Sequence, residues 1–144
     1  MAITQALPNS FKKQLLDGDQ DFTLSTGDKF KLALYVSTAT LGAATTSYTT
    51  GGEVSSSGTN YTTGGKALVN SGTSLVSTVA FTDFADLSFQ NVTLTARGCL
   101  IYNTSFSNAA VAVLSFTTDK TATAGTFTIQ FPAFTSSAAI IRIS

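Results

Sequence analysis

The sequence contains no histidine and no tryptophan, only one cysteine and two prolines, and 11% charged residues among its 144 positions. Without histidine, Ser-His-Asp and Cys-His catalytic sites are impossible, and the commonest general base and zinc ligand is missing. The single cysteine, Cys99, cannot form an internal disulfide, and its apolar neighbours Leu100 and Ile101 predict a core residue. These absences favour a protein that is not an enzyme and that needs no cofactor.

Charge is balanced as well as scarce, since eight basic and eight acidic residues give a net charge of zero. A neutral chain lacks the basic face that nucleic-acid binding requires, so no nucleic-acid partner is expected. The longest apolar runs, such as residues 109–114 and 138–141, are far shorter than the roughly 20 residues that span a bilayer. Residues 1–20 lack the apolar block of a secretory signal peptide. We therefore expect synthesis in the cytoplasm and no membrane partner.

Hydroxyl side chains provide much of the polarity that charged side chains usually provide, because the chain contains 25 Thr and 17 Ser. From Asp21 onward, apolar and polar residues alternate with the period of half-buried strands. The expected strands span residues 30–36, 66–69, 74–81, 87–89, 93–102, 110–117, 126–131 and 139–143. Eight or so short strands predict an all-β fold, an antiparallel sandwich of the jelly-roll or immunoglobulin-like type, with less than about 15% helix. The expected core includes Phe30, Leu32, Leu34, Leu100, Val113, Phe127, Ile129 and Ile141.

The only helix signal lies in an N-terminal arm at residues 1–20, ahead of a sandwich domain at residues 21–144. Asn9 or Ser10 is predicted to cap a short helix, and Gly18 is predicted to end it. Its apolar residues are expected to share one stripe, which consists of Phe11, Leu15 and Leu16. Two turns are too short to be stable alone, so the stripe should dock on the sandwich or on a neighbouring subunit.

Residues 37–65 form a long segment dominated by Ser, Thr, Gly and Ala. A loop of this length in a compact domain usually belongs to a binding or contact surface. The pentapeptide Tyr-Thr-Thr-Gly-Gly occurs there twice, at residues 48–52 and 61–65. The repeat indicates either two similar turns or a repeated ligand-binding unit.

A contact surface in this segment would use tyrosines as anchors and charges as its rim. The alternative is that both tyrosines cover one end of their own sandwich. Together with the helix, the segment provides the interface candidates Phe11, Leu15, Tyr48, Tyr61, Glu53 and Lys66.

Two groups of carboxylates are the remaining candidates for chemistry. Asp83 and Asp86 are the closest pair for a hydrolase. Asp17, Asp19 and Asp21 have the alternate spacing of calcium loops, but the twelfth position is Asp28, where an EF-hand requires Glu. A solvated turn is the preferred interpretation, and no metal is expected.

The succession of motifs also resembles a family of small structural proteins of tailed bacteriophages. The resemblance extends over nearly the whole chain and is carried by its strand patterns. The matching segments are Asn-Ser-Phe-Lys at residues 9–12, Gly-Asp-Lys-Phe-Lys-Leu-Ala-Leu-Tyr at 27–35, Thr-Ala-Arg-Gly-Cys-Leu-Ile-Tyr-Asn at 95–103, Ala-Val-Ala-Val-Leu-Ser-Phe at 110–116, Phe-Thr-Ile-Gln-Phe-Pro at 127–132 and Ala-Ile-Ile-Arg-Ile at 139–143. It implies a virion component, a capsid cement or decoration protein, with a neck, tail or fibre component as the alternative. No catalytic residues come with this family.

Three functional hypotheses follow from these observations. The first is a virion protein that binds other copies of itself and neighbouring capsid or tail proteins. The second is a receptor-binding or carbohydrate-binding sandwich that stacks sugars on its tyrosines, which are Tyr35, Tyr48, Tyr61 and Tyr102. The third is a minimal enzyme that uses Asp83 and Asp86.

Overall fold

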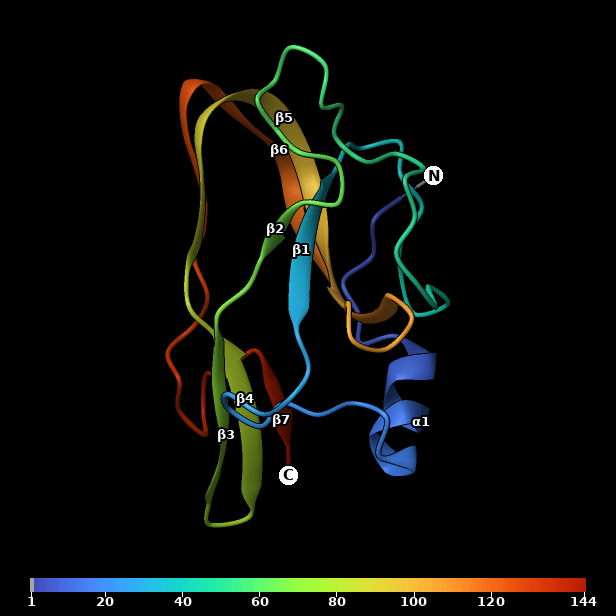
Figure 1. Cartoon of the computed structure of the whole chain (residues 1–144), viewed down its shortest axis with the longest axis vertical. Coiled ribbons are helices and arrows are strands. Elements are labelled where there is room, and N and C mark those ends of the chain that lie inside the picture. Colours follow the sequence, from blue (N-terminus) through green and yellow to red (C-terminus); the bar gives the residue numbers. More distant parts are fainter. Residues whose placement is uncertain (1) are drawn as a thin grey trace.

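The computed structural model describes residues 2–144, which form two antiparallel β-sheets and one helix (Figure 1). The elements are α1 Asn9–Asp17, β1 Phe30–Tyr35, β2 Lys66–Ala67, β3 Asn70–Val76, β4 Val79–Phe84, β5 Leu87–Asn103, β6 Ala109–Ile129 and β7 Ile141–Ile143. One sheet has the order β2-β1-β5-β6 and the other the order β3-β4-β7. Strands make up 47% of the chain and helix 6%, which confirms the predicted β-rich class and the low helix content.

Several expected strands differ from the observed ones. Bulges lie where loops between strands were expected, and a turn lies within one expected strand. The segments 87–89 and 93–102 belong to the single strand β5, and most of 110–117 and 126–131 belongs to β6. Register shifts in the β5–β6 ladder occur near Asn91, whose φ is 54°, and β6 contains Thr117 and Ala124 with φ of 66° and 44°. Bulges of this kind bend a strand without ending it. The expected strand 74–81 is instead the β3–β4 hairpin, which turns at Ser77 with φ of 54°.

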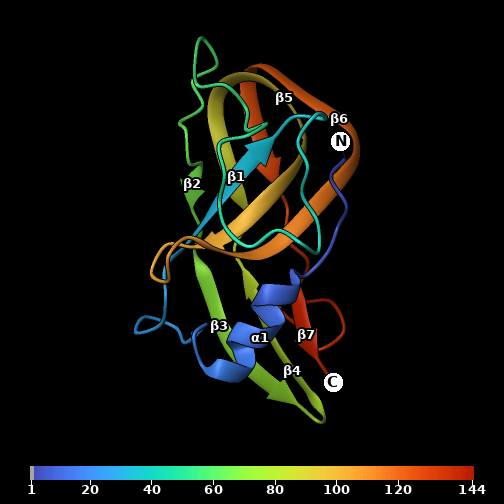
Figure 2. The same cartoon turned by 90° about the vertical axis from the view of Figure 1, so that its right-hand side faces the viewer.

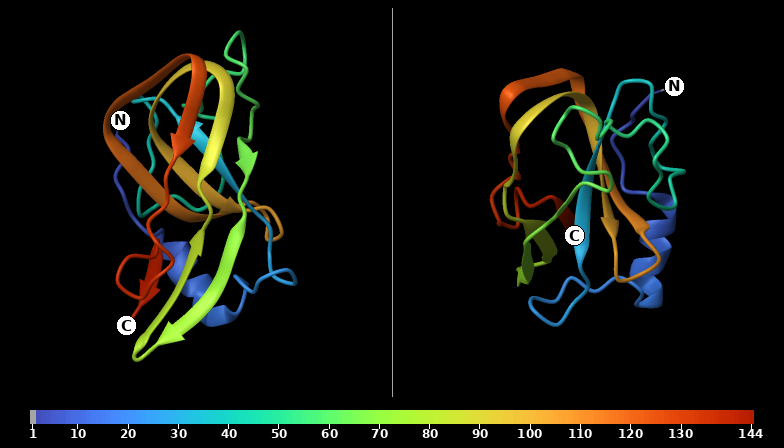
Figure 3. Two further views of the ribbon diagram at one scale, coloured as in Figure 1. Left: turned by 90° about the vertical axis from the view of Figure 1, so that its left-hand side faces the viewer. Right: turned by 45° about the horizontal axis from the view of Figure 1, so that its top comes forward.

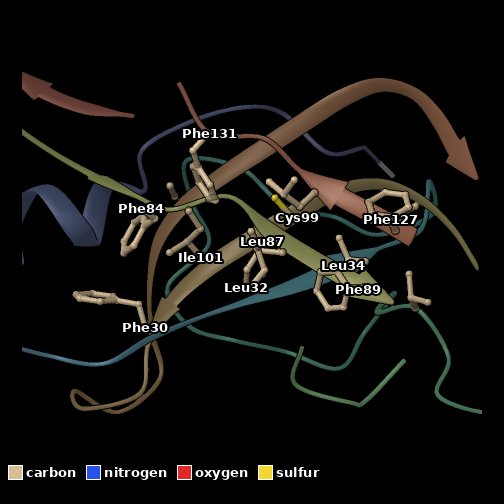
Figure 4. Close-up of a cluster of buried hydrophobic side chains, with 14 of the residues drawn as sticks. Phe30, Leu32, Leu34, Phe84, Leu87, Phe89, Cys99, Ile101, Phe127 and Phe131 are labelled. Carbon is tan, nitrogen blue, oxygen red and sulfur yellow. The ribbon is translucent and has the colours of Figure 1, made fainter. Parts of the chain in front are cut away.

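The bent β5–β6 hairpin arches over one end of the molecule and encloses the main hydrophobic core (Figures 2 and 4). Leu34 on β1 lies in the same buried cluster as Phe89 on β5 and Phe127 on β6. All eight residues predicted for the core are buried, with at most 7% of each exposed. Cys99 also lies in this cluster, which confirms its prediction as a core residue.

A second buried cluster lies on the opposite face of the β1–β5–β6 sheet. Ala33, Tyr35, Leu100 and Val113 alternate along their strands with residues of the main core, so these strands are buried on both faces. The covering layer comes from the 37–65 segment and the N-terminal arm, which contribute Ala39, Leu41, Tyr48 and Ile3. Backbone bridges join Ile3 to Leu41, Ala6 to Val113 and Ser47 to Ala109. The mainly polar segment is therefore packed against the sheet.

Helix α1 also docks on its own chain. Phe11 is fully buried, and its ring contacts that of Phe22 with 6.0 Å between centroids. Leu16 is 91% exposed, so the prediction that it shares the buried stripe is wrong, because it lies about 100° around the helix from Leu15. Gly18 ends the helix in the left-handed conformation, as predicted. The helix begins after Pro8 without a side-chain cap, so the capping prediction for Asn9 or Ser10 is wrong.

Within the described chain, α1 is the only helix, and its nine residues fall short of the length and apolar character of a membrane-spanning helix.

Candidate functional site

The side chain of Glu53, the only glutamate in the chain, lies at the centre of a hydrogen-bond network. Its Oε2 accepts a hydrogen bond from the Tyr48 hydroxyl at 2.6 Å. Its Oε1 accepts one from the Tyr61 hydroxyl at 2.8 Å and one from the Gly64 N–H at 2.7 Å. Each carboxylate oxygen thus has a donor from the same chain, and charge-assisted bonds of this type are among the stronger ones.

The other two tyrosines join the same region through backbone carbonyls and ring stacking. The Tyr102 hydroxyl donates to the Gly64 carbonyl at 2.5 Å, and the Tyr35 hydroxyl donates to the Thr49 carbonyl at 2.6 Å. The rings of Tyr48 and Tyr102 stack with centroids 4.7 Å apart. We call Glu53 and the four tyrosines the Glu53 network. It connects the 37–65 segment to β1 and β5.

Burial keeps these tyrosines protonated. Desolvation raises the pKa of Tyr61 well above its usual range, and the nearby Glu53 carboxylate raises it further. The pKa values of Tyr35, Tyr48 and Tyr102 are also raised, first by burial and then by the interaction with Glu53. The tyrosine hydroxyls therefore act as hydrogen-bond donors in this network and are not poised to lose protons.

Each copy of Tyr-Thr-Thr-Gly-Gly contains a tight turn. The Glu53 N–H donates to the Thr50 carbonyl in the first copy, and the Gly65 N–H donates to the Thr62 carbonyl in the second. Gly52 and Gly65 have φ of 78° and 80°. A Cβ at Gly65 would lie 1.8 Å from the Leu32 carbonyl oxygen, and a Cβ at Gly52 would lie 2.6 Å from the Cβ of Ala39. Only glycine fits such positions. The two copies thus form turns of different register, so the repeated sequence does not produce one repeated structural unit.

The structure corrects the role expected for several interface candidates. Tyr61 is 2% exposed and Phe11 is fully buried, so neither is available as a surface anchor in this conformation. Tyr48 and Leu15 are half-buried. The Lys66 ammonium donates to the Ser88 carbonyl at 2.6 Å, and the Glu53 carboxylate is occupied by the donors described above. All six candidates therefore bond or pack within their own chain. Phe11 and Leu15 pack in or against the hydrophobic core, and Tyr48, Glu53, Tyr61 and Lys66 form hydrogen bonds.

The tyrosines also differ from the stacking platforms that a carbohydrate-binding surface needs. Tyr35, Tyr61 and Tyr102 are each at most 3% exposed, and Tyr48 has one ring face against Tyr102. Sugar stacking requires an open aromatic face. The Glu53 network is thus a structural site that fixes a long polar segment.

Asp83 and Asp86 do not form an accessible pair of carboxylates. Asp83 is 1% exposed, and its Oδ1 accepts the Phe84 N–H at 2.9 Å. Its Oδ2 is buried and has no hydrogen-bond partner among the described residues. Asp86 is exposed, and its Oδ1 accepts the Phe131 N–H at 2.8 Å. Asp83 therefore lies out of reach of a substrate.

Replacement of Asp83 by Asn is expected to stabilise the protein at pH 7. Burial raises the pKa of Asp83 above its unfolded value, so ionisation costs the folded state stability as the pH rises past the unfolded pKa. Removal of the charge should raise the free energy of unfolding by about 1 kcal/mol at pH 7, which is about 3 °C in Tm. At pH 3 the two proteins should unfold at nearly the same temperature.

Calorimetry at both pH values measures this difference, with Asp119→Asn as the exposed control. A lower Tm for Asp83→Asn at pH 7 than for the wild type would contradict the assigned cost of the buried charge.

The acidic cluster near the end of α1 is occupied by local contacts. Asp17 pairs with Lys13 at 2.5 Å, and Asp21 Oδ1 accepts the Thr23 N–H at 2.9 Å. The bonds from Thr23 lower the pKa of Asp21. Across residues 2–144, no group of three or more His, Cys, Asp or Glu side chains is arranged to hold a metal ion.

The segments that carry the exposed large apolar side chains lie at the other end of the molecule from the 37–65 segment (Figures 1 and 3). We call this region the β3–β4–β7 end; its exposed large apolar residues are Leu16, Leu24, Val69, Leu75, Val76, Phe134 and Ile143. A cleft of about 300 Å³ lies beside them, and its lining includes Leu15, Phe22, Ala80 and Ile141. The alternation of apolar and polar residues does not predict this surface. The adjacent apolar pair Leu75-Val76 signals it, because only one of two successive strand residues can face a core.

Comparison with known protein families, with curated proteins and with solved structures finds no match to this chain.

Proposed function

We propose that the protein is a non-enzymatic structural component of a phage virion, a capsid cement or decoration protein that acts through contacts with other copies and with neighbouring virion proteins. The observation that carries the contact role is the set of exposed apolar side chains gathered at the β3–β4–β7 end. Large apolar side chains exposed in one region of a folded domain are typical of interaction sites. The virion placement comes from the resemblance of the strand motifs to small phage structural proteins.

The rest of the molecule supports such a role as a rigid scaffold. The Glu53 network and the second hydrophobic cluster fix the 37–65 segment on the sheet. The net charge of zero permits many copies to associate closely, because self-repulsion is weak. We further propose that the two sheets form a single rigid sandwich of the jelly-roll or immunoglobulin-like type.

Quantitative mass spectrometry of purified particles from a phage that encodes this chain tests the proposal. A cement or decoration protein should be present in hundreds of copies for each particle. A few copies, or a few dozen, would assign the chain to a neck, tail or fibre. Its absence from purified particles, with the protein present in infected cells, would overturn the virion role.

A further inference from the structure

Strand β3 lies along an open edge of the β3-β4-β7 sheet (Figure 3). The start of the strand is covered, since the Asn70 side-chain amide donates to the Phe22 carbonyl at 3.0 Å and Gly72 packs beside Leu24. Beyond Gly72 the strand pairs regularly with β4 from Thr73 to Val76. No hydrogen bond from the described residues reaches the outer side of this stretch. Its outward backbone groups are free to pair with another strand.

This edge lacks the usual protection against pairing. Exposed edges normally carry charged residues, prolines or bulges that discourage a second strand. Residues 67–82, which include all of β3, contain no charged residue and no proline, and the one bulge lies before Thr73. Leu75 and Val76 are 68% and 50% exposed at the open stretch. An unprotected edge beside exposed apolar side chains is suited to strand addition.

We propose that a second copy of this chain pairs along β3 in an antiparallel arrangement, so that two three-stranded sheets become one six-stranded sheet across a two-fold axis. This inference rests on the proposed contact role and identifies a second copy of the chain as one of the partners. The absence of charge from β3 favours a second copy as the partner and β3 as the edge that pairs. A two-fold contact places each residue near its own copy, which an uncharged strand tolerates.

The other edge of the same sheet is less suited to self-pairing. Strand β7 has Arg142 as its middle residue, and a two-fold contact centred there would bring two guanidinium groups together. Like charges directly opposite each other destabilise a strand pair. On β3, the register that places Leu75 opposite Leu75 of the second copy covers one exposed leucine with the other. It also brings Ser74 opposite Val76 of the second copy.

Substitution of Leu75 by Lys tests this pairing, because it places two ammonium groups opposite each other at the two-fold axis. Sedimentation equilibrium of the wild type should show a dimer at high protein concentration, since strand contacts of this size are weak. Leu75→Lys should reduce association at least about tenfold, whereas Leu16→Lys, at an exposed leucine on α1, should leave it unchanged. The Tm of each variant, measured on the monomer, should stay close to that of the wild type.

A mixture of Leu75→Lys and Leu75→Glu proteins tests the register. The two variants should each be monomeric alone and should form a heterodimer when mixed, because opposite charges then meet at the axis. A monomeric wild type at concentrations up to about 1 mM would overturn the inference. Equal association of Leu75→Lys and the wild type, or mixing that restores no dimer, would overturn it as well.

These outcomes are separate from those of the proposed function. A chain that is monomeric in solution but abundant in purified particles loses the β3 pairing and keeps the virion role. A chain that dimerises through β3 but is absent from particles keeps the pairing and loses the virion role.

Discussion

Replacement of Glu53 by Ala is expected to lower the free energy of unfolding by about 3–5 kcal/mol, because it leaves several buried donors without an acceptor. The buried Tyr61 hydroxyl and the buried Gly64 N–H both bond to Glu53 Oε1, and the Tyr48 hydroxyl bonds to Oε2. Each unsatisfied buried donor costs about 1–3 kcal/mol. Urea denaturation followed by circular dichroism measures the change, and the tyrosine near-ultraviolet signal should weaken.

Glu53→Gln is the matched control for this prediction. The amide keeps one acceptor oxygen and nearly the same shape but removes the charge, so its cost should be clearly smaller than that of Ala. If Glu53→Ala costs less than about 1 kcal/mol, the network does not hold the 37–65 segment in place.

Replacement of Phe30 by Ala is expected to cost about 3–5 kcal/mol, the range for a large buried aromatic that leaves a cavity. Phe30 is 3% exposed. Its ring stacks on Phe22 at a centroid distance of 4.7 Å and meets Phe84 edge-on at 5.5 Å. The side chain thus connects the segment after α1 to β1 and β4. Thermal and urea unfolding should both show the loss.

Phe134→Ala provides the comparison, because Phe134 is 42% exposed and touches Phe81 at 5.0 Å between centroids. This substitution should lower the free energy of unfolding by less than about 1 kcal/mol. Similar losses for the two variants would contradict the distinction between the enclosed core and the exposed β3–β4–β7 end.

The alternation of apolar residues identified the core because it depends only on which side chains face inward along each strand. Phe30, Leu32 and Leu34 on β1 are all buried as predicted. The strand boundaries were less accurate because Asn91, Thr117 and Ala124 adopt positive φ within long strands. Asn often adopts a positive φ, but Thr and Ala rarely do, so nothing at Thr117 or Ala124 signals a bulge, and a polar gap in the sequence resembles a loop.

The Glu53 network needed the tertiary structure, because its tyrosines come from four separate places in the chain. The two Tyr-Thr-Thr-Gly-Gly copies and the lone glutamate were visible, but Tyr35 and Tyr102 belong to strands that only the sheet brings together. Sequence reasoning placed tyrosine and glutamate on a contact surface because such residues are common there. The structure uses them inside, where burial and bonding to Glu53 hold a polar segment against the sheet.

We propose that the β3–β4–β7 end, and not the 37–65 segment, forms the contact surface. Hydrogen-exchange mass spectrometry on the free protein and on the protein within purified particles tests this claim most directly. We predict new protection of the amides of residues 69–76 in the particle, with residues 37–65 exchanging as they do in the free protein. Protection confined to residues 37–65, with residues 69–76 unchanged, would contradict it.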